Sequence, residues 1–574
     1  MKSAWIAFGA LAGTVALGLA LRGRGAGPVT LPLRPVTDQR LAAADTSGDW
    51  LTYGRDLRQH RYAPFDQINA GSVARLKPLW HEGGIHLLKS YLRNESTPVV
   101  ADGMLIYTDP GIRTGEPGNH VTAVDARTGR KLWGWYRRTT GGALCCGLVN
   151  RGVALYGDKV YVGTLDGHLV ALDRRTGSVV WDRRVEGAEP SEGYSFTMAP
   201  LAAGGKIIIG TSGGEFRIRG FLDAYNPETG ERAWRFYTVP SPEEGGWWGR
   251  WAATTPDGDP LPRDIAQERR DSAAYPDEWR RGGGPVWTTP AYDQALGLVI
   301  FGIGNPSPVE GRTPPGDNLY TNSIAAVDVA TGKLRWYYQV VPHDVWDYDP
   351  AGPPILIDIA QDGDTVPAVA EAGKTGWVYI LDRRTGRRIR RSDPLVPHER
   401  LFAAPTPEGA RTAPGTHGGS NWPSAAYSPA TGVMYVVGSH FPMRYRVDSA
   451  AGAAADARVP GPDRHQFGVF SEIKGEPRHG VVSAVDVTTG RIRWQHEVES
   501  PLVFGGTLAL AGGLVLFSEV GALHALDAAT GATRWRYLLG KGTLGPPISF
   551  MLDGRQRVAV ASSRGVTVFG LPGR

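Results

Sequence analysis

The stretch AVDARTGRKLW at residues 123–133 decides the fold, because copies of it recur along the chain. The copies are ALDRRTGSVVW at 171–181, AYNPETGERAW at 224–234, AVDVATGKLRW at 326–336, ILDRRTGRRI at 380–389, AVDVTTGRIRW at 484–494 and ALDAATGATRW at 525–535. Each copy reads as a strand, a Thr-Gly turn and a second strand. The turn glycine allows the chain to reverse with a positive φ. The unit therefore predicts a series of hairpins.

The spacing of the copies predicts how these hairpins assemble. Successive units lie 41 to 53 residues apart, except for two spacings of 102 and 105 residues. These two spacings are about twice the usual one. Each contains a weaker copy of the repeat, AYDQALG at 291–297 and AYSPATG at 426–432. A period of this length with several strands and an aromatic motif is typical of a β-propeller. We predict an all-β fold over residues 45–574, an eight-bladed β-propeller with tryptophan-docking repeats, with seven or nine blades left open.

Composition and the amino terminus narrow the class of protein. The chain has 574 residues with 77 Gly, 43 Pro and 18 Trp, and its net charge is only +5. Arginines are scattered through turns, so we expect no nucleic-acid partner. An uncharged segment from Ala4 to Leu21 follows Lys2 and precedes Arg22. Residues 1–28 therefore predict a signal peptide or membrane anchor, and a periplasmic protein that is secreted or tethered to the inner membrane.

The only two cysteines, Cys145 and Cys146, are adjacent. Neighbouring Cα atoms lie about 3.8 Å apart, closer than the separation of roughly 4.4–6.8 Å that is usual for a disulfide. A bond between them would close a small strained ring and crosslink nothing distant. The residues alone leave two interpretations open, a rigid vicinal disulfide at a site or two free thiols.

Between residues 49 and 440 the chain resembles the quinoprotein alcohol dehydrogenases of methanol dehydrogenase type. The motifs that carry the resemblance occur in the family's order. They are GDWLTYGRDLRQHRYAPFDQIN, NESTPVV, the CC pair with VNRG, GTLDGHLVALD, GTSGGEFRIRGFLDAYNPETGE, GGGPVW, GIGNPSP, PPGDNLYTNSIAAVD, PHDVWDYD, EAGKTGWVYILDR and HGGSNW. The resemblance implies a pyrroloquinoline quinone (PQQ) cofactor in the propeller axis and periplasmic oxidation of an alcohol to an aldehyde.

The resemblance also implies which residues hold the cofactor. Trp287 matches the floor on which the quinone stacks, and a Cys145–Cys146 disulfide matches the opposite wall. Lys374 matches the cation beside the reactive quinone oxygens. The other expected cofactor-binding residues are Glu95, Arg151, Thr164, Ser212, Gly213, Gly214, Asn421 and Trp422.

A metal ion and a general base complete the implied site. Glu215, Asn305, Asp347 and Asp349 match the metal ligands, and their oxygens suit a hard cation. Asp347 matches the catalytic base that takes the alcohol proton while hydride passes to PQQ, and Glu215 is a rival base. The acidic residue at Asp349 and the small Gly214 favour a lanthanide(III), although glucose-dehydrogenase relatives share the WD-x-D pattern, so Ca²⁺ stays open.

Partners and alternatives follow from what the sequence contains. With only the CC pair, the chain has no CxxCH motif and cannot attach its own c-type haem, so we expect a separate c-type cytochrome as electron acceptor. A homodimer is left open, and a nicotinamide cofactor is disfavoured because no phosphate-binding glycine loop follows a strand. The alternatives are PQQ-dependent oxidation of sugars, polyols or aldehydes, and a non-catalytic propeller scaffold of outer-membrane assembly type.

Overall fold

The computed structural model describes residues 31–83, 94–109, 118–139, 144, 146–308, 313–361, 363–447, 470–501, 505–540, 542 and 545–573. The predicted leader at 1–28 lies outside the described residues, as do Cys145 and Val503 to Phe504. Among the described helices, none combines the length and the apolar character that crossing a bilayer requires.

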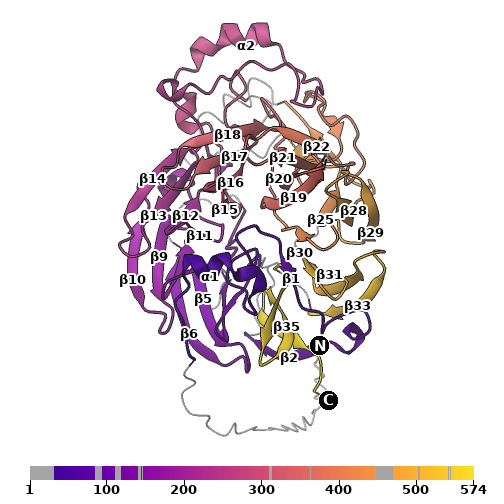
Figure 1. The fold of residues 1–574 in the computed structure, drawn as a ribbon. Coiled ribbons are helices and arrows are strands. Elements are labelled where there is room, and N and C mark those ends of the chain that lie inside the picture. The colour runs from indigo at the N-terminus through magenta and orange to yellow at the C-terminus, as the bar shows by residue number, and fades with distance from the viewer. Residues whose placement is uncertain are drawn as a thin grey trace, which may run out of the picture.

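Antiparallel sheets of four neighbouring strands dominate the described structure and are arranged in a ring (Figure 1). The first four sheets are β3 (Val99–Ala101), β4 (Met104–Asp109), β5 (Gly118–Asp125) and β6 (Lys131–Arg138); β7 (Ala154–Tyr156), β8 (Lys159–Gly163), β9 (His168–Asp173) and β10 (Val179–Arg184); β11 (Leu201–Ala203), β12 (Lys206–Gly210), β13 (Phe221–Tyr225) and β14 (Arg232–Tyr237); β15 (Ala291–Asp293), β16 (Leu298–Ile303), β17 (Ser323–Asp328) and β18 (Leu334–Gln339).

The next sheets continue the same order. They are β19 (Ile355–Gln361), β20 (Asp364–Ala372), β21 (Val378–Asp382) and β22 (Arg388–Arg391); β24 (Ala426–Ser428), β25 (Val433–His440), β28 (His479–Asp486) and β29 (Ile492–Val498); and β30 (Thr507–Leu510), β31 (Leu514–Glu519), β32 (Ala522–Asp527) and β33 (Thr533–Leu538), to which β1 (Tyr62–Ala63) adds in parallel. In most of these sheets the repeat motif forms the third and fourth strands.

The two ends of the chain share one sheet, which closes the ring. This sheet contains β34 (Ile548–Leu552), β35 (Arg555–Ser562) and β36 (Gly565–Gly570), and its outer strand is β2 (Lys77–Glu82) from near the amino terminus. β2 pairs antiparallel with β36. β36 is therefore not an edge strand. An edge strand at this position would expose unpaired backbone groups.

The two long spacings between repeats contain inserted segments. Residues 241–286 carry the helix α2 (Ile265–Asp271), which projects beyond the ring of sheets (Figure 1). The other spacing contributes a small sheet of β23 (Ala410–Thr412), β26 (Met443–Tyr445) and β27 (Phe470–Glu472). The two weaker copies of the repeat form β15 and β24. These are the first strands of two sheets, and the outer strands of those sheets carry Trp336 and Trp494. Among the described residues, each double-length spacing therefore contributes to a single additional four-stranded sheet.

Short helices occupy several connections. They are α1 (Asp38–Ala42) and the 3₁₀ turns η1 (Ala44–Thr46), η2 (Val73–Arg75), η3 (Pro190–Glu192), η4 (Gly214–Phe216), η5 (Pro242–Glu244), η6 (Ser272–Ala274) and η7 (Glu278–Arg281).

Five of the six repeat tryptophans, all except Trp535, contact the Thr-Gly turn of the next repeat. The indole N–H of Trp133 donates to the carbonyl oxygen of Arg174 at 2.8 Å, and a Cβ placed on Gly177 would lie 2.6 Å from the Trp133 ring. The same pairing recurs between Trp181 and Gly230 and between Trp336 and Gly386. Glycine is required at these turns for two reasons, the positive φ and the close approach of the indole.

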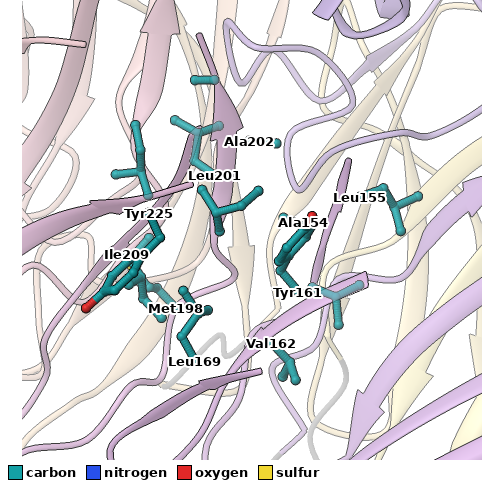
Figure 2. Close-up of a cluster of buried hydrophobic side chains, with 14 of the residues drawn as sticks. Ala154, Leu155, Tyr161, Val162, Leu169, Met198, Leu201, Ala202, Ile209 and Tyr225 are labelled. Carbon is teal, nitrogen blue, oxygen red and sulfur yellow. The ribbon is translucent and has the colours of Figure 1, made fainter. Parts of the chain in front are cut away.

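Apolar side chains from neighbouring sheets pack into continuous cores. Figure 2 shows part of one such core, where Tyr161 and Leu169 of one sheet lie near Leu201, Ile209 and Tyr225 of the next. Tyr161, Leu169 and Ile209 are fully buried. This packing fixes the position of each sheet relative to its neighbours.

The strand order determines which loops share a face of the ring. In an antiparallel meander, the residues before the first strand and those after the second strand lie at the same end of the sheet. Arg151 precedes β7, Glu215 follows β12, Trp287 precedes β15, Asp349 precedes β19 and Lys374 follows β20. These residues therefore meet on one face, and the Thr-Gly turns lie on the opposite face.

Candidate active site

A cavity of about 500 Å³ lies where these loops converge. Its lining contains most of the residues that the sequence predicted for the site. These are Glu95, Cys146, Arg151, Ser212, Gly213, Glu215, Trp287, Asp347, Asp349, Lys374, Asn421 and Trp422. Residues separated by more than 300 positions in the chain are thus brought into one site.

A local hydrogen-bonded turn presents Asp347 and Asp349 to this cavity. The carboxylate of Asp344 accepts hydrogen bonds from the backbone N–H groups of Trp346 and Tyr348, both at 2.9 Å. Within the turn Asp347 adopts the left-handed backbone conformation with φ of 66°, an arrangement that is rare for a residue with a side chain. The Asp344 side chain therefore fixes the conformation of this turn without a ligand.

Lys374 joins the two carboxylates. Its Nζ atom lies 2.8 Å from Oδ2 of Asp347 and 2.6 Å from Oδ1 of Asp349. The side chains of all three residues are at least 85% buried. Oδ1 of Asp347 is buried without a hydrogen-bond partner among the described residues. Such an atom is costly to bury unless a ligand supplies the missing contact.

The pKa values of this group reflect its burial and its excess of negative charge. Burial raises the pKa of Asp347 well above its usual range, Lys374 opposes the shift, and the charges of Asp349 and Glu215 add to it. Burial alone would lower the pKa of Lys374, but the two aspartates outweigh it and raise that pKa. Three carboxylates thus act around one lysine, and a bound cation would relieve their repulsion.

Trp287 forms an aromatic wall that also contacts the acidic group. Its indole N–H donates to Oδ2 of Asp349 at 3.1 Å. The guanidinium of Arg151 lies 5.0 Å from the ring centre and is paired with Glu95 at 2.6 Å. Arg151 also contacts the hydroxyl of Thr197 at 2.9 Å. A flat aromatic face and a buried cation are the groups that a planar, carboxylated ring system needs.

Oxygen donors from two further loops lie close together at the edge of the cavity. The amide N–H of Asn305 donates to the carbonyl of Pro306 at 2.9 Å, which leaves Oδ1 as the outward atom. A Cβ placed on Gly214, next to Glu215, would lie 3.2 Å from this Oδ1 and 2.7 Å from Pro285. The absence of a side chain at Gly214 is therefore what allows the two loops to approach.

This donor set fits a hard cation. Carboxylate oxygens of Glu215, Asp347 and Asp349 together with the amide oxygen of Asn305 are the ligand types that Ca²⁺ and related ions prefer. Within the described ranges, no three His, Cys, Asp or Glu side chains already form a metal cluster. Asp347 and Asp349 instead contact Lys374, so an ion would compete with the lysine for their oxygens.

Some predicted residues lie outside the cavity lining. Asn305 and Gly214 stand immediately beside it, as described above. The hydroxyl of Thr164 accepts from the N–H of His168 at 3.0 Å within the turn after β8, and its proposed cofactor contact stays a prediction. Cys145 lies outside the described residues, so the predicted disulfide also stays a prediction.

Sequence reasoning missed one wall of the cavity. This wall contains Thr416, His417, Val437, Ser439, Phe470 and Glu472, and Thr197, Pro285 and Pro423 complete the lining. His417 is the first residue of the HGGSNW motif and Thr416 directly precedes it, so this motif is the signal that could have identified them. Phe470 and Glu472 come from β27 in the inserted sheet, where no repeat pattern marks them.

Comparisons with known proteins identify the family of the chain. The family described as "Glucose/ethanol/alcohol dehydrogenase, beta-propeller domain" matches residues 50–391 and 390–558. Quinoprotein alcohol dehydrogenase PedH of Pseudomonas putida is 34% identical over 544 residues, which cover 90% of this chain and 86% of that protein. Quinohemoprotein alcohol dehydrogenase of Comamonas testosteroni is 35% identical over 564 residues, covering 93% of this chain and 75% of that protein.

Solved structures give the same result. The crystal structure of the Comamonas testosteroni enzyme has a TM-score of 0.78 and 32% identity, over 94% of this chain and 83% of that chain. A europium-containing methanol dehydrogenase has a TM-score of 0.75 and 27% identity, over 93% of this chain and 100% of the other. The ring of sheets is that of a β-propeller quinoprotein oxidoreductase. The chain belongs to the PQQ-dependent alcohol dehydrogenase family.

Proposed function

We propose that this chain oxidises an alcohol to an aldehyde, with Asp347 as the general base and PQQ held against Trp287. The observation that carries the proposal is the buried Asp347–Lys374–Asp349 group at the wall of a cavity with an aromatic face. PQQ, when bound, would supply the acceptor for the hydride of the alcohol carbon. Asp347 takes the hydroxyl proton, and Lys374 compensates the negative charge of the two aspartates.

The residues of the cavity have distinct proposed roles. Arg151, with Glu95 and Thr197 holding its guanidinium, binds a carboxylate of the cofactor. Ser212, Gly213, Asn421 and Trp422 provide further contacts along the cofactor edge, and the Cys145–Cys146 pair covers the face opposite Trp287. Glu215, Asn305, Asp347 and Asp349 hold the metal ion, which would polarise a cofactor carbonyl as a Lewis acid.

We infer that the metal is a lanthanide(III), with Ca²⁺ as the alternative. Asp349 supplies one more negative charge at 1% exposure, and a trivalent ion is stabilised more by each buried carboxylate than a divalent ion is. Gly214 lets the loop of Glu215 approach Asn305, since a Cβ at this position would lie 3.2 Å from Oδ1 of Asn305. The europium-containing relative supports this inference.

The proposed architecture is an eight-bladed propeller in which each repeat tryptophan docks on the next blade. Seven four-stranded sheets and one five-stranded sheet support this count among the described residues. The indole contacts with the next Thr-Gly turn support the docking. We further propose a periplasmic location, membrane tethering or export through residues 1–28, and electron transfer to a separate c-type cytochrome, because the chain has only the adjacent cysteines. Homodimerisation is proposed as well.

Reconstitution of the apoprotein tests the function. Purified apoprotein is given PQQ with Ca²⁺ or La³⁺, and reduction of an artificial dye or of an oxidised c-type cytochrome is followed with alcohols, sugars, polyols and aldehydes. We expect alcohols to be the preferred substrates and La³⁺ to support the higher rate. Preference for sugars, polyols or aldehydes would replace the alcohol assignment, and activity with Ca²⁺ alone would remove the lanthanide assignment. Failure to bind PQQ with either ion would leave only the scaffold alternative.

A further inference from the structure

Thr416 lies on a loop far from Asp347 in sequence but contacts its carboxylate. We propose that Thr416 is a positioning residue, which fixes Asp347 through Oδ2 and leaves Oδ1 as the atom that meets the substrate hydroxyl. The inference rests on the proposed role of Asp347 as the base. It names the atom of Asp347 that acts and the residue that selects it.

The hydrogen bonds of the carboxylate are distributed unequally. The Thr416 hydroxyl donates to Oδ2 of Asp347, 69 residues away in the chain. The ammonium of Lys374 contacts the same oxygen at 2.8 Å. Oδ1 is buried and has no hydrogen-bond partner among the described residues. Two donors therefore hold one oxygen, and the other is left for a ligand.

Lys374 by itself cannot select the orientation of this carboxylate. Its ammonium is shared with Asp349 at 2.6 Å, so it can move toward either aspartate. The terminal torsion of an aspartate side chain is broad and roughly two-fold. A directional hydroxyl contact supplied by a third residue removes this freedom. Among the residues that the structure describes, the Thr416 hydroxyl donates to Asp347 alone.

The loop that carries Thr416 is fixed by two hydrogen bonds at the residues that directly precede it. The N–H of Gly415 donates to the carbonyl of Phe441 at 2.9 Å, which ties the loop to the chain that follows β25. The Tyr348 hydroxyl donates to the carbonyl of Pro414 at 2.7 Å, and Tyr348 directly follows Asp347. Thr416 itself is 3% exposed. The donor and the acceptor are thus held on two linked, buried segments.

Three variants test the proposal. Thr416→Val keeps the shape of the side chain and removes the hydroxyl, and Thr416→Ser keeps the hydroxyl and removes the methyl group. Thr507→Val is the control, because the Thr507 hydroxyl is also buried and donates to backbone carbonyls, that of Tyr435 at 2.9 Å and that of Ser424 at 3.4 Å. Loss of a hydrogen bond to a charged group corresponds to about 10- to 100-fold in rate.

We expect Thr416→Val to lower kcat by that factor, with KM and the PQQ affinity of the apoprotein unchanged when the affinity is measured by quenching of tryptophan fluorescence. Thr416→Ser should restore kcat, and Thr507→Val should leave it at the wild-type value. A crystal structure of the Thr416→Val apoprotein should show the Asp347 carboxylate rotated or in two orientations. Thr416→Ala replaces the valine variant if that protein does not fold.

Several results would overturn the proposal. Unchanged kcat in Thr416→Val, equal losses in the serine and valine variants, or an unmoved Asp347 carboxylate in the crystal would each do so. An equal loss in Thr507→Val would assign the effect to general destabilisation. If wild-type protein binds PQQ but oxidises no substrate, the proposed function fails while the crystal structure still decides whether Thr416 positions Asp347.

Discussion

Asp349 contacts Trp287, the aromatic wall of the cavity, and is also one of the proposed metal ligands. One of its oxygens accepts the Trp287 indole N–H at 3.1 Å, and the other pairs with Lys374 at 2.6 Å. The side chain is 1% exposed. A substitution at this position can therefore affect the charge of the site and the orientation of Trp287 separately, depending on which atoms it removes.

Asp349→Asn should reduce La³⁺-dependent activity more strongly than Ca²⁺-dependent activity. Asparagine keeps an oxygen that can accept the Trp287 N–H, but it removes one negative charge, which a trivalent ion needs more than a divalent ion does. The measurement is metal affinity and rate for both ions in the reconstituted enzyme. Asp349→Ser, which also loses the Trp287 contact, serves as the comparison. An unchanged ratio between the two ions would contradict the role of Asp349 as a ligand.

His398 is a half-buried histidine outside the cavity. Its ring meets Trp377 edge to face with ring centres 4.2 Å apart, and its Nε2 atom is buried without a hydrogen-bond partner among the described residues. Burial lowers the pKa of His398 to about 4, the Arg391 charge adds to the shift, and the backbone of Thr375 and Asp259 oppose it. The folded protein therefore keeps this ring neutral.

The stability of the protein should fall between pH 6.5 and pH 4 because of His398. In this window the unfolded chain, with a histidine pKa of about 6.5, binds a proton that the folded state does not. Stability is thus lost as the pH falls, by up to about 3 kcal/mol for this group. His398→Phe keeps an aromatic ring against Trp377 and should show a smaller loss, measured by urea unfolding at pH 4.5 and pH 7. Equal losses in both proteins would contradict the pKa shift.

At the scale of the element, the contact between a tryptophan and the next Thr-Gly turn joins successive sheets. Gly177 has φ of 75°, and a Cβ on it would lie 2.6 Å from the Trp133 ring. Gly513 has φ of 74°, but a Cβ on it would meet nothing within 4 Å. The two glycines differ in their surroundings and share the same backbone conformation, so they form a matched pair.

Gly177→Ala should destabilise the protein more than Gly513→Ala. Both variants place a side chain in the left-handed region, at a cost of about 1–2 kcal/mol. Only Gly177→Ala also crowds an indole, which adds about 1–3 kcal/mol by overpacking. The free energy of unfolding in urea provides the measurement. Equal destabilisation would show that the indole contact does not hold the two sheets together.

At the scale of the whole molecule, the site exists only because the ring is closed. Arg151, Glu215, Trp287, Asp347 and Lys374 come from connections in four successive sheets. The chain ends are joined by pairing of β2 with β36. A ligand that contacts all these loops would bind the folded ring and not the unfolded chain, so its binding should stabilise the entire fold.

PQQ with its metal should therefore raise the thermal midpoint of the apoprotein in a concentration-dependent way. At a ligand concentration 100-fold above Kd the expected stabilisation is about 2.7 kcal/mol. Differential scanning fluorimetry over a series of PQQ concentrations measures it. Arg151→Gln, which removes the buried cation, should shift the response to higher PQQ concentration. A midpoint that does not respond to PQQ would contradict the assignment of the cavity as the cofactor site.

Repeats and motifs predicted much of the fold and of the site because they record local structure. The Thr-Gly units correspond to observed hairpins, and Asp347 and Lys374 were recognised from motifs that form single turns. The two double spacings contain inserted segments, and their weaker copies of the repeat form the strands β15 and β24. One feature was not predicted. The wall formed by Thr416, Phe470 and Glu472 lies in those insertions, where no period marks a position.

The sequence by itself determined the hairpins, the turns that require glycine and the residue types of the site, because each depends on neighbours along the chain. Only the tertiary structure decided which side chains meet. Trp287 contacts Asp349 across 62 residues, and Thr416 contacts Asp347 across 69 residues. Such contacts arise because packing between sheets and closure of the ring bring the loops of one face together. The Thr-Gly repeat therefore specifies the hairpins of the scaffold, and the closed ring brings the side chains of the site together.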